Sequence, residues 1–105
     1  MSTHTLNDVR VAFENDLHTK RDLSLHTIRA YAGDLESFFI HLQALGVSDI
    51  HNIDISHLRS WLANISVKGG ARTTLARRAV TIRLFTKWAH KNGYLSKDIG
   101  VTLAT

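Results

Sequence analysis

The chain of 105 residues contains no cysteine and no proline. Without cysteine it has no disulfide framework and no thiolate metal site, so it suits a reducing compartment and we expect a cytoplasmic protein. The absence of proline favours helices, which proline interrupts. No run of about 18 apolar residues occurs, so we expect no segment that spans a membrane.

The sequence also lacks the motifs that are typical of metal-binding, nucleotide-binding and catalytic sites. Seven histidines are present, but His51 and His57 are six residues apart, a spacing that does not place them on one helical face, and the others are dispersed. There is no P-loop, no G-x-S-x-G and no G-x-G-x-x-G. Packing explains Tyr31 and Tyr94 better than nucleophilic catalysis does. We therefore expect that this chain alone is not an enzyme and takes no metal or small-molecule cofactor.

Acidic residues are missing altogether between Ile55 and Lys97, where nine lysines and arginines occur. Residues 1–54 hold four basic residues against eight acidic ones, a formal charge of −4, and the rest of the chain carries +8. The commonest partner for such a one-sided positive field is a phosphate backbone. A solvated face with surplus lysine and arginine is the simpler explanation. On charge alone, both interpretations stay open.

Apolar residues recur at spacings of three and four in four segments, which predicts helices near residues 6–20, 24–45, 55–66 and 72–92. Ser24 is a suitable N-cap, and Gly46 and Gly93 suit the position just after a helix. Residues 46–55 are expected to be a connection. Four amphipathic helices with short connections predict an all-α fold, a compact bundle of four main helices. The side chains expected in its core are those of Phe13, Ile28, Tyr31, Leu35, Phe38, Leu42, Leu58, Leu62, Leu75, Ile82 and Phe85.

Basic residues of the last predicted helix share one solvent face. At about 100° per residue, five of them lie opposite the apolar stripe. They are Arg72, Arg77, Arg83, Lys87 and Lys91. Arg78 falls nearer the apolar side, and the sequence leaves its role open.

Two of the predicted helices carry motifs of a known family. One reads Leu23-Ser24-x-x-Thr27-x-x-Ala30-Tyr31-x-x-Asp34-Leu35-x-x-Phe38, and the other reads Leu75-Ala76-Arg77-Arg78-x-x-x-Ile82-Arg83-x-Phe85-x-x-Trp88. With Trp61-Leu62 and Gly93-Tyr94-Leu95, this ordered set resembles the N-terminal, SAM-like core-binding domain of the XerC/XerD and phage-integrase family of tyrosine recombinases. The resemblance covers about residues 6–103. Asp98-Ile99 stands where the family usually has Asn-Pro.

The resemblance implies a DNA-binding domain over residues 1–95 and, over residues 96–105, the start of a linker to a catalytic domain that this chain lacks. The parent would be a recombinase that cleaves and rejoins DNA for integration, excision or chromosome-dimer resolution. Its partners would be double-stranded DNA and other recombinase protomers. The polar faces of the second and fourth predicted helices would grip the half-site. The implied DNA contacts are Thr27, Arg29, Arg72, Thr73, Thr74, Arg77, Arg83 and Lys87.

Two alternatives remain. A SAM-like helical protein-interaction module would meet an acidic protein surface with the same basic face. A stand-alone helix-turn-helix regulator is the other alternative, but the connection from about Ser66 to Ala71 contains two glycines and looks longer than the usual tight turn. The sequence leaves open the target site, the partner recombinase and whether the event is chromosome segregation or integration of a mobile element.

Overall fold

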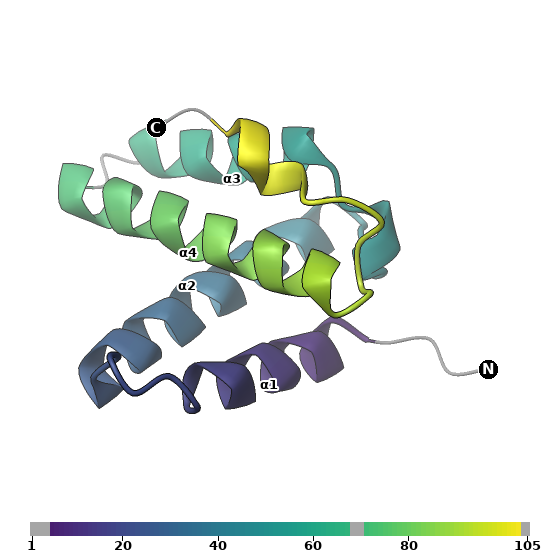
Figure 1. Ribbon diagram of the computed structural model, residues 1–105. Helices are drawn as coiled ribbons and strands as arrows, with labels where there is room; N and C mark the ends of the chain where they lie inside the picture. Colours follow the sequence, from purple (N-terminus) through teal and green to yellow (C-terminus); the bar gives the residue numbers. More distant parts are fainter. Residues whose placement is uncertain (1–4, 68–70, 104–105) are drawn as a thin grey trace.

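The computed structural model describes residues 5–67 and 71–103, and this part of the chain is all-α (Figure 1). Its helices are α1 (Leu6–Leu17), α2 (Leu25–Ala44), α3 (Ile55–Val67) and α4 (Arg72–Lys91), with two short 3-10 helices, η1 (Ile50–Asn52) and η2 (Ile99–Thr102). Within the described residues there is no sheet, only one isolated bridge between Thr5 and Asp49. The prediction of an all-α bundle with four main helices is confirmed.

Side-chain caps fix where the first two long helices begin. The Thr5 hydroxyl accepts from the backbone N–H of Asp8 at 3.0 Å, and the Asp8 carboxylate accepts from that of Thr5 at 3.4 Å. Such a capping box satisfies two amides that the helix leaves unpaired. The Ser24 hydroxyl accepts from the Thr27 N–H at 3.1 Å, so Ser24 is the N-cap that the sequence predicted.

The ends of α2 and α4 were also predicted correctly, whereas α4 begins without a side-chain cap. Gly46 and Gly93 have φ values of 81° and 82°, a left-handed conformation that favours glycine. At the start of α4 the N-cap position is Ala71, which makes no side-chain capping bond. Thr73 and Thr74 lie in the first turn instead.

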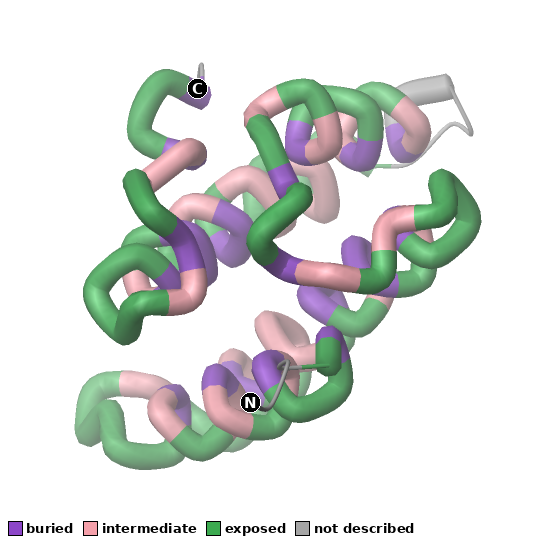
Figure 2. The backbone as a smooth tube through the Cα atoms, turned by 90° about the vertical axis from the view of Figure 1, so that its right-hand side faces the viewer, coloured by how far each residue is buried: buried purple, intermediate pink, exposed green. Residues whose placement is uncertain are grey.

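Helix α2 is central, because it contacts α1 on one side and α3 and α4 on the other. In Figure 1, α1 lies below α2 and α4 crosses in front of it, while α3 and η2 lie above. Buried positions recur along each helix with exposed positions between them, as Figure 2 shows. This alternation is the amphipathic pattern that the sequence carries.

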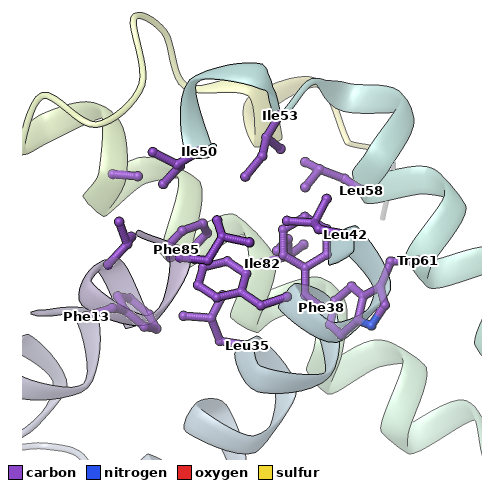
Figure 3. Packing of buried hydrophobic residues seen from close by; sticks show 14 of the residues in the cluster. Phe13, Leu35, Phe38, Leu42, Ile50, Ile53, Leu58, Trp61, Ile82 and Phe85 are labelled. Carbon is purple, nitrogen blue, oxygen red and sulfur yellow. The ribbon is translucent and has the colours of Figure 1, made fainter. Parts of the chain in front are cut away.

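The core is an aromatic cluster surrounded by aliphatic side chains (Figure 3). Phe85 of α4 contacts Phe13 of α1 and Phe39 of α2 edge to face, with ring centroids 5.4 and 5.6 Å apart. Phe38 contacts Trp61 of α3 in the same way at 5.3 Å. Aromatic side chains of all four helices therefore meet in one interior.

Eight of the eleven predicted core residues are buried, and three are only half-buried. Leu75 lies in the part of α4 that precedes its first buried residue, Thr81. Tyr31 borders an open groove, and Leu62 packs against the core from its margin. These three predictions were wrong because periodicity identifies the side of a helix that faces inward, but not how far the neighbouring helices extend along it.

Two irregular segments complete the core, and the sequence analysis assigned neither of them to it. Ile50 and Ile53 are buried in the connection between α2 and α3. Leu95 and Leu103 are buried on either side of η2. Short irregular segments have no period, so their buried residues leave no pattern to read.

Helix η2 is tied to α4 at Thr86. The Asp98 carboxylate accepts from the Thr86 hydroxyl at 2.8 Å and from the Gly100 N–H at 3.2 Å. A methyl group added at Gly100 would overlap the Thr86 hydroxyl, so only glycine fits there without a shift. Packed structure thus extends to Leu103. The division into a domain over residues 1–95 and a linker from residue 96 stays a prediction.

Candidate nucleic-acid interface

The eight predicted DNA contacts lie on two packed helices, Thr27 and Arg29 on α2 and the other six on α4. Both helices begin at the same end of the molecule, on the left of Figure 1. Of the eight residues, five are exposed and three are half-buried. The exposed ones are Arg29, Arg72, Thr73, Arg77 and Lys87, and the half-buried ones are Thr27, Thr74 and Arg83.

A buried carboxylate joins α2 to α4 next to this surface. Asp34 of α2 is 1% exposed. Its Oδ1 accepts from Arg77 Nη2 at 2.6 Å and from Arg78 Nε at 3.3 Å. Its Oδ2 accepts from Arg77 Nε at 2.9 Å and from the Thr81 hydroxyl at 2.8 Å. Four hydrogen bonds and two cationic partners compensate the loss of hydration that burying a carboxylate entails.

Arg77 differs from the sequence-based expectation. It was placed on the open solvent face, but one edge of its guanidinium lies against Asp34, and the side chain is 42% exposed. The hydrogen bonds that Arg77 donates to the Asp34 carboxylate raise the pKa of Arg77 above its ordinary value. Its exposed part still reaches the surface of α4.

The structure gives Arg78 a clear role that the sequence left open. Its guanidinium lies over the ring of Trp61, 5.3 Å from the centroid, while its Nε donates to Asp34. Trp61 in turn donates from Nε1 to the Ser37 hydroxyl at 3.2 Å. Arg78 therefore joins α4 to both α2 and α3, and its role in the fold is structural.

Arg83 is less open than predicted. Its Nη1 is buried, and among the described residues it finds no hydrogen-bond acceptor. Arg83 precedes Thr86 by three residues, which places both on the side of α4 where η2 packs. The sequence analysis did not foresee η2, so it could not foresee that this side of α4 is partly covered.

The exposed face of α4 is not uniformly basic. Val80 and Leu84 are 39% and 40% exposed between Arg77 and Lys87. Beyond them, Lys87 lies at the edge of a groove of about 590 Å³ between α1, α2 and α4. Its apolar lining comes mainly from Phe13, Leu17, Leu23, Tyr31, Leu84 and Trp88. Its charged lining has both signs, with Lys20, Lys87 and Lys91 beside Asp16 and Asp22.

Sequence reasoning quoted Asp34 in a family motif but gave it no role. A signal was nevertheless present, because Asp34 lies three residues after Tyr31 and four before Phe38 on the same predicted helix. An acid at the edge of an apolar stripe requires partners. The region from Ile55 to Lys97, which has basic residues and no acids, supplies these partners as Arg77 and Arg78.

The described part of the chain shows neither a metal-binding cluster nor a membrane-spanning helix. Residues 5–67 and 71–103 contain no group of three or more histidines and acids that could hold a metal ion. No helix described there is both long and apolar enough to cross a membrane.

Comparison with known proteins relates the sequence of this chain to one family. The model of the phage integrase N-terminal SAM-like domain matches residues 11–93. Tyrosine recombinase XerC of Mycobacterium leprae (strain TN) is 44% identical over 86 residues, which cover 82% of this chain and 29% of the relative. Tyrosine recombinase XerC of Mycobacterium tuberculosis (strain ATCC 25177 / H37Ra) is 45% identical over 86 residues, covering 82% and 28%.

A more distant relative agrees. Tyrosine recombinase XerC of Bifidobacterium longum (strain DJO10A) is 35% identical over 94 residues, covering 90% of this chain and 26% of the relative. The chain spans less than a third of the length of these curated relatives. No solved structure gives a significant match.

Proposed function

Because the chain belongs to the family of phage integrase N-terminal SAM-like domains, we propose that it is the DNA-binding part of a XerC-type site-specific tyrosine recombinase. In this proposal the longer protein cleaves and rejoins DNA in the cytoplasm, in integration, excision or chromosome-dimer resolution. Other recombinase protomers are its protein partners. This chain contributes binding, and the catalytic groups belong to the rest of the protein.

The observation that carries the proposal is the charge of α4. The helix contains no acidic residue, and Arg72, Arg77 and Lys87 are all exposed along it. The acid that neutralises part of this charge, Asp34, is itself buried. A duplex approaching α4 therefore meets cationic side chains, which replace the condensed counterions of the phosphate backbone.

The start of α4 adds a second source of phosphate contacts. Ala71 offers no side-chain acceptor to the first-turn amides, whereas Thr5 and Ser24 do so at the starts of α1 and α2. Helix N-terminal amides bind anions, and the hydroxyls of Thr73 and Thr74 lie in the same turn. In the proposal these groups receive a phosphate.

The remaining candidates differ in how much of each side chain is available. Arg29 is exposed on α2 and is free to reach phosphate. Thr27 helps to cap α2, since its hydroxyl accepts from Ser24 at 3.0 Å. Arg83 is proposed to contact DNA only through the part of its guanidinium that is not buried.

A salt titration tests the proposal. We expect the chain to bind a fluorescein-labelled duplex of mixed sequence, with an affinity that falls steeply between about 50 and 200 mM salt. Arg72→Ala and Lys87→Ala should each reduce the slope of log K against log salt by about one unit. Fluorescence anisotropy measures both quantities.

The control removes the same charge from another helix. Arg10 on α1 pairs with Glu14 at 2.8 Å, away from the proposed interface, so Arg10→Ala should leave the slope unchanged. An equal loss for Arg10→Ala, or no binding at low salt, would contradict the proposal. Tighter binding to an acidic protein than to duplex DNA would favour the interaction-module alternative.

A further inference from the structure

We propose that Asp34 is a positioning residue for DNA recognition, because it holds the Nε–Nη2 edge of the Arg77 guanidinium and leaves the terminal edge available to the nucleic acid. This inference rests on the proposed function. It assigns the buried acid of α2 a role in binding although the acid itself touches no DNA.

The geometry of the pair shows which donors remain. A guanidinium carries five N–H groups. Arg77 uses Nε and Nη2 side by side on the two oxygens of Asp34, at 2.9 and 2.6 Å. Among the described residues, every hydrogen bond of this guanidinium goes to Asp34. The outer edge, formed by Nη1 and the second hydrogen of Nη2, is the fork that fits guanine O6 and N7 or two phosphate oxygens.

Two donors other than Arg77 hold the carboxylate, so it can fix the arginine. Thr81 donates to Oδ2 at 2.8 Å and Arg78 donates to Oδ1 at 3.3 Å. Arg78 is in turn placed over the Trp61 ring. An arginine ordered in this way before binding has less rotamer freedom left to lose when it meets its target.

Simple electrostatics predicts the opposite effect of Asp34. A carboxylate close to the interface repels phosphates, so its removal should tighten binding to any duplex. Positioning predicts that its removal weakens binding, even though the net charge of the protein rises by one. The two explanations therefore differ in sign, which makes the role of Asp34 measurable.

The experiment is a double-mutant cycle on the full chain, with Asp34→Asn and Arg77→Ala alone and combined. The probe is the duplex that this chain enriches from a random-sequence pool, titrated by fluorescence anisotropy. We expect Asp34→Asn to weaken binding about tenfold, the scale of one bidentate base contact. In the Arg77→Ala background, the same change should alter binding less than about twofold.

Three outcomes would overturn the inference. Equal weakening by Asp34→Asn in both backgrounds would show a general structural role. Tighter binding by Asp34→Asn would show that only its charge matters. Binding unchanged by Arg77→Ala, while Arg72→Ala and Lys87→Ala weaken it, would remove Arg77 from the interface and leave the proposed function intact. Failure of the unaltered chain to bind any duplex would overturn the proposed function itself.

If circular dichroism shows that Asp34→Asn does not fold, a milder variant, Thr81→Val, tests the same inference. Thr81→Val keeps the shape of a fully buried side chain and removes one of the donors that hold the carboxylate. We expect a loss of affinity of about threefold, smaller than that of a whole bidentate contact. This loss should disappear in the Arg77→Ala background, and its persistence there would contradict the inference.

Discussion

The two halves of α4 are held in place by different forces. In the second half, from Thr81 to Ala89, five residues are buried, and Phe85 contacts the rings of both Phe13 and Phe39. In the first half, from Arg72 to Val80, no residue is buried. Two arginines there reach back to one acid, Asp34.

This difference shows how a small domain can fix a charged surface without covering it. Apolar packing requires that side chains leave the solvent, whereas an ion pair with a buried acid holds an arginine whose outer edge stays in the solvent. Four of the proposed DNA contacts lie on the first half of α4, where burial is absent. They are Arg72, Thr73, Thr74 and Arg77.

The largest effect should come from the packed half. Phe85→Ala removes a fully buried ring and should lower the free energy of unfolding by about 3–5 kcal/mol. Leu84→Ala is the matched control. The Leu84 side chain is next to Phe85 in the sequence but 40% exposed, so its removal should cost less than about 1.5 kcal/mol. Urea denaturation measures both, and equal losses would show that the buried ring of Phe85 does not hold the second half of α4 in place.

Removal of the acid that holds the other half should cost less. Asp34→Ala leaves Arg77 and Arg78 without their carboxylate, but both arginines can turn to water, so we expect a loss of about 2–3 kcal/mol. Glu36→Ala removes an exposed acid from the same helix and should stay within about 0.5 kcal/mol of the parent. If the two variants unfold at the same urea concentration, the network contributes nothing to stability.

A third change tests how tightly the second half of α4 is covered. Gly100→Ala places a methyl group against the Thr86 hydroxyl and should destabilise the protein by about 1–3 kcal/mol. In a Thr86→Ala background the oxygen that causes the overlap is gone, so the added cost of Gly100→Ala should fall. Thermal unfolding followed by circular dichroism measures this difference. An unchanged cost in that background would show that the fit at Gly100 does not depend on Thr86.

The smallest change in stability should come from the loss of a solvent-exposed polar contact at the start of α3. The pKa of Asp54 is lowered from 3.8, chiefly because the Ser56 hydroxyl donates to it. A carboxyl with a lowered folded pKa stabilises the protein above its unfolded pKa, and this stabilisation is lost as the pH falls through the folded value. Ser56→Ala should raise the pKa of Asp54 and slightly reduce stability near neutral pH.

An NMR titration of the Asp54 carboxyl measures that shift. The stability difference between Ser56→Ala and the parent should disappear once the pH is low enough to protonate Asp54 in both proteins. A pKa of Asp54 that does not move would show that the hydroxyl is not the cause of its lowering.

The sequence predicted the helices well because each has a clear apolar period, although α1 ends at Leu17 and not near residue 20, and α4 begins without a side-chain cap. Ser24, Gly46 and Gly93 marked three of the helix ends correctly. The sequence did not predict η1 or η2, since segments of three and four residues have no period. Their buried residues became evident only when the helices were packed together.

The candidate site was predicted less completely, because its key contact joins residues 43 positions apart. Helical periodicity placed Arg77 on the outside of α4, but it does not predict which residue of another helix Arg77 contacts. It placed Arg83 outside as well, since it did not foresee η2. Arg72 and Lys87 are exposed, and for these two the sequence sufficed to place them at the surface.

The docking of η2 determines how short this protein can be made. A chain trimmed after Leu95, the boundary that the motifs suggest, would lose Asp98 and the apolar cover of Leu103. The Thr86 hydroxyl would keep only the Arg83 carbonyl, 3.3 Å away, as its acceptor. The smallest unit that preserves the packed half of α4 therefore ends no earlier than Leu103, eight residues beyond the last recognisable motif.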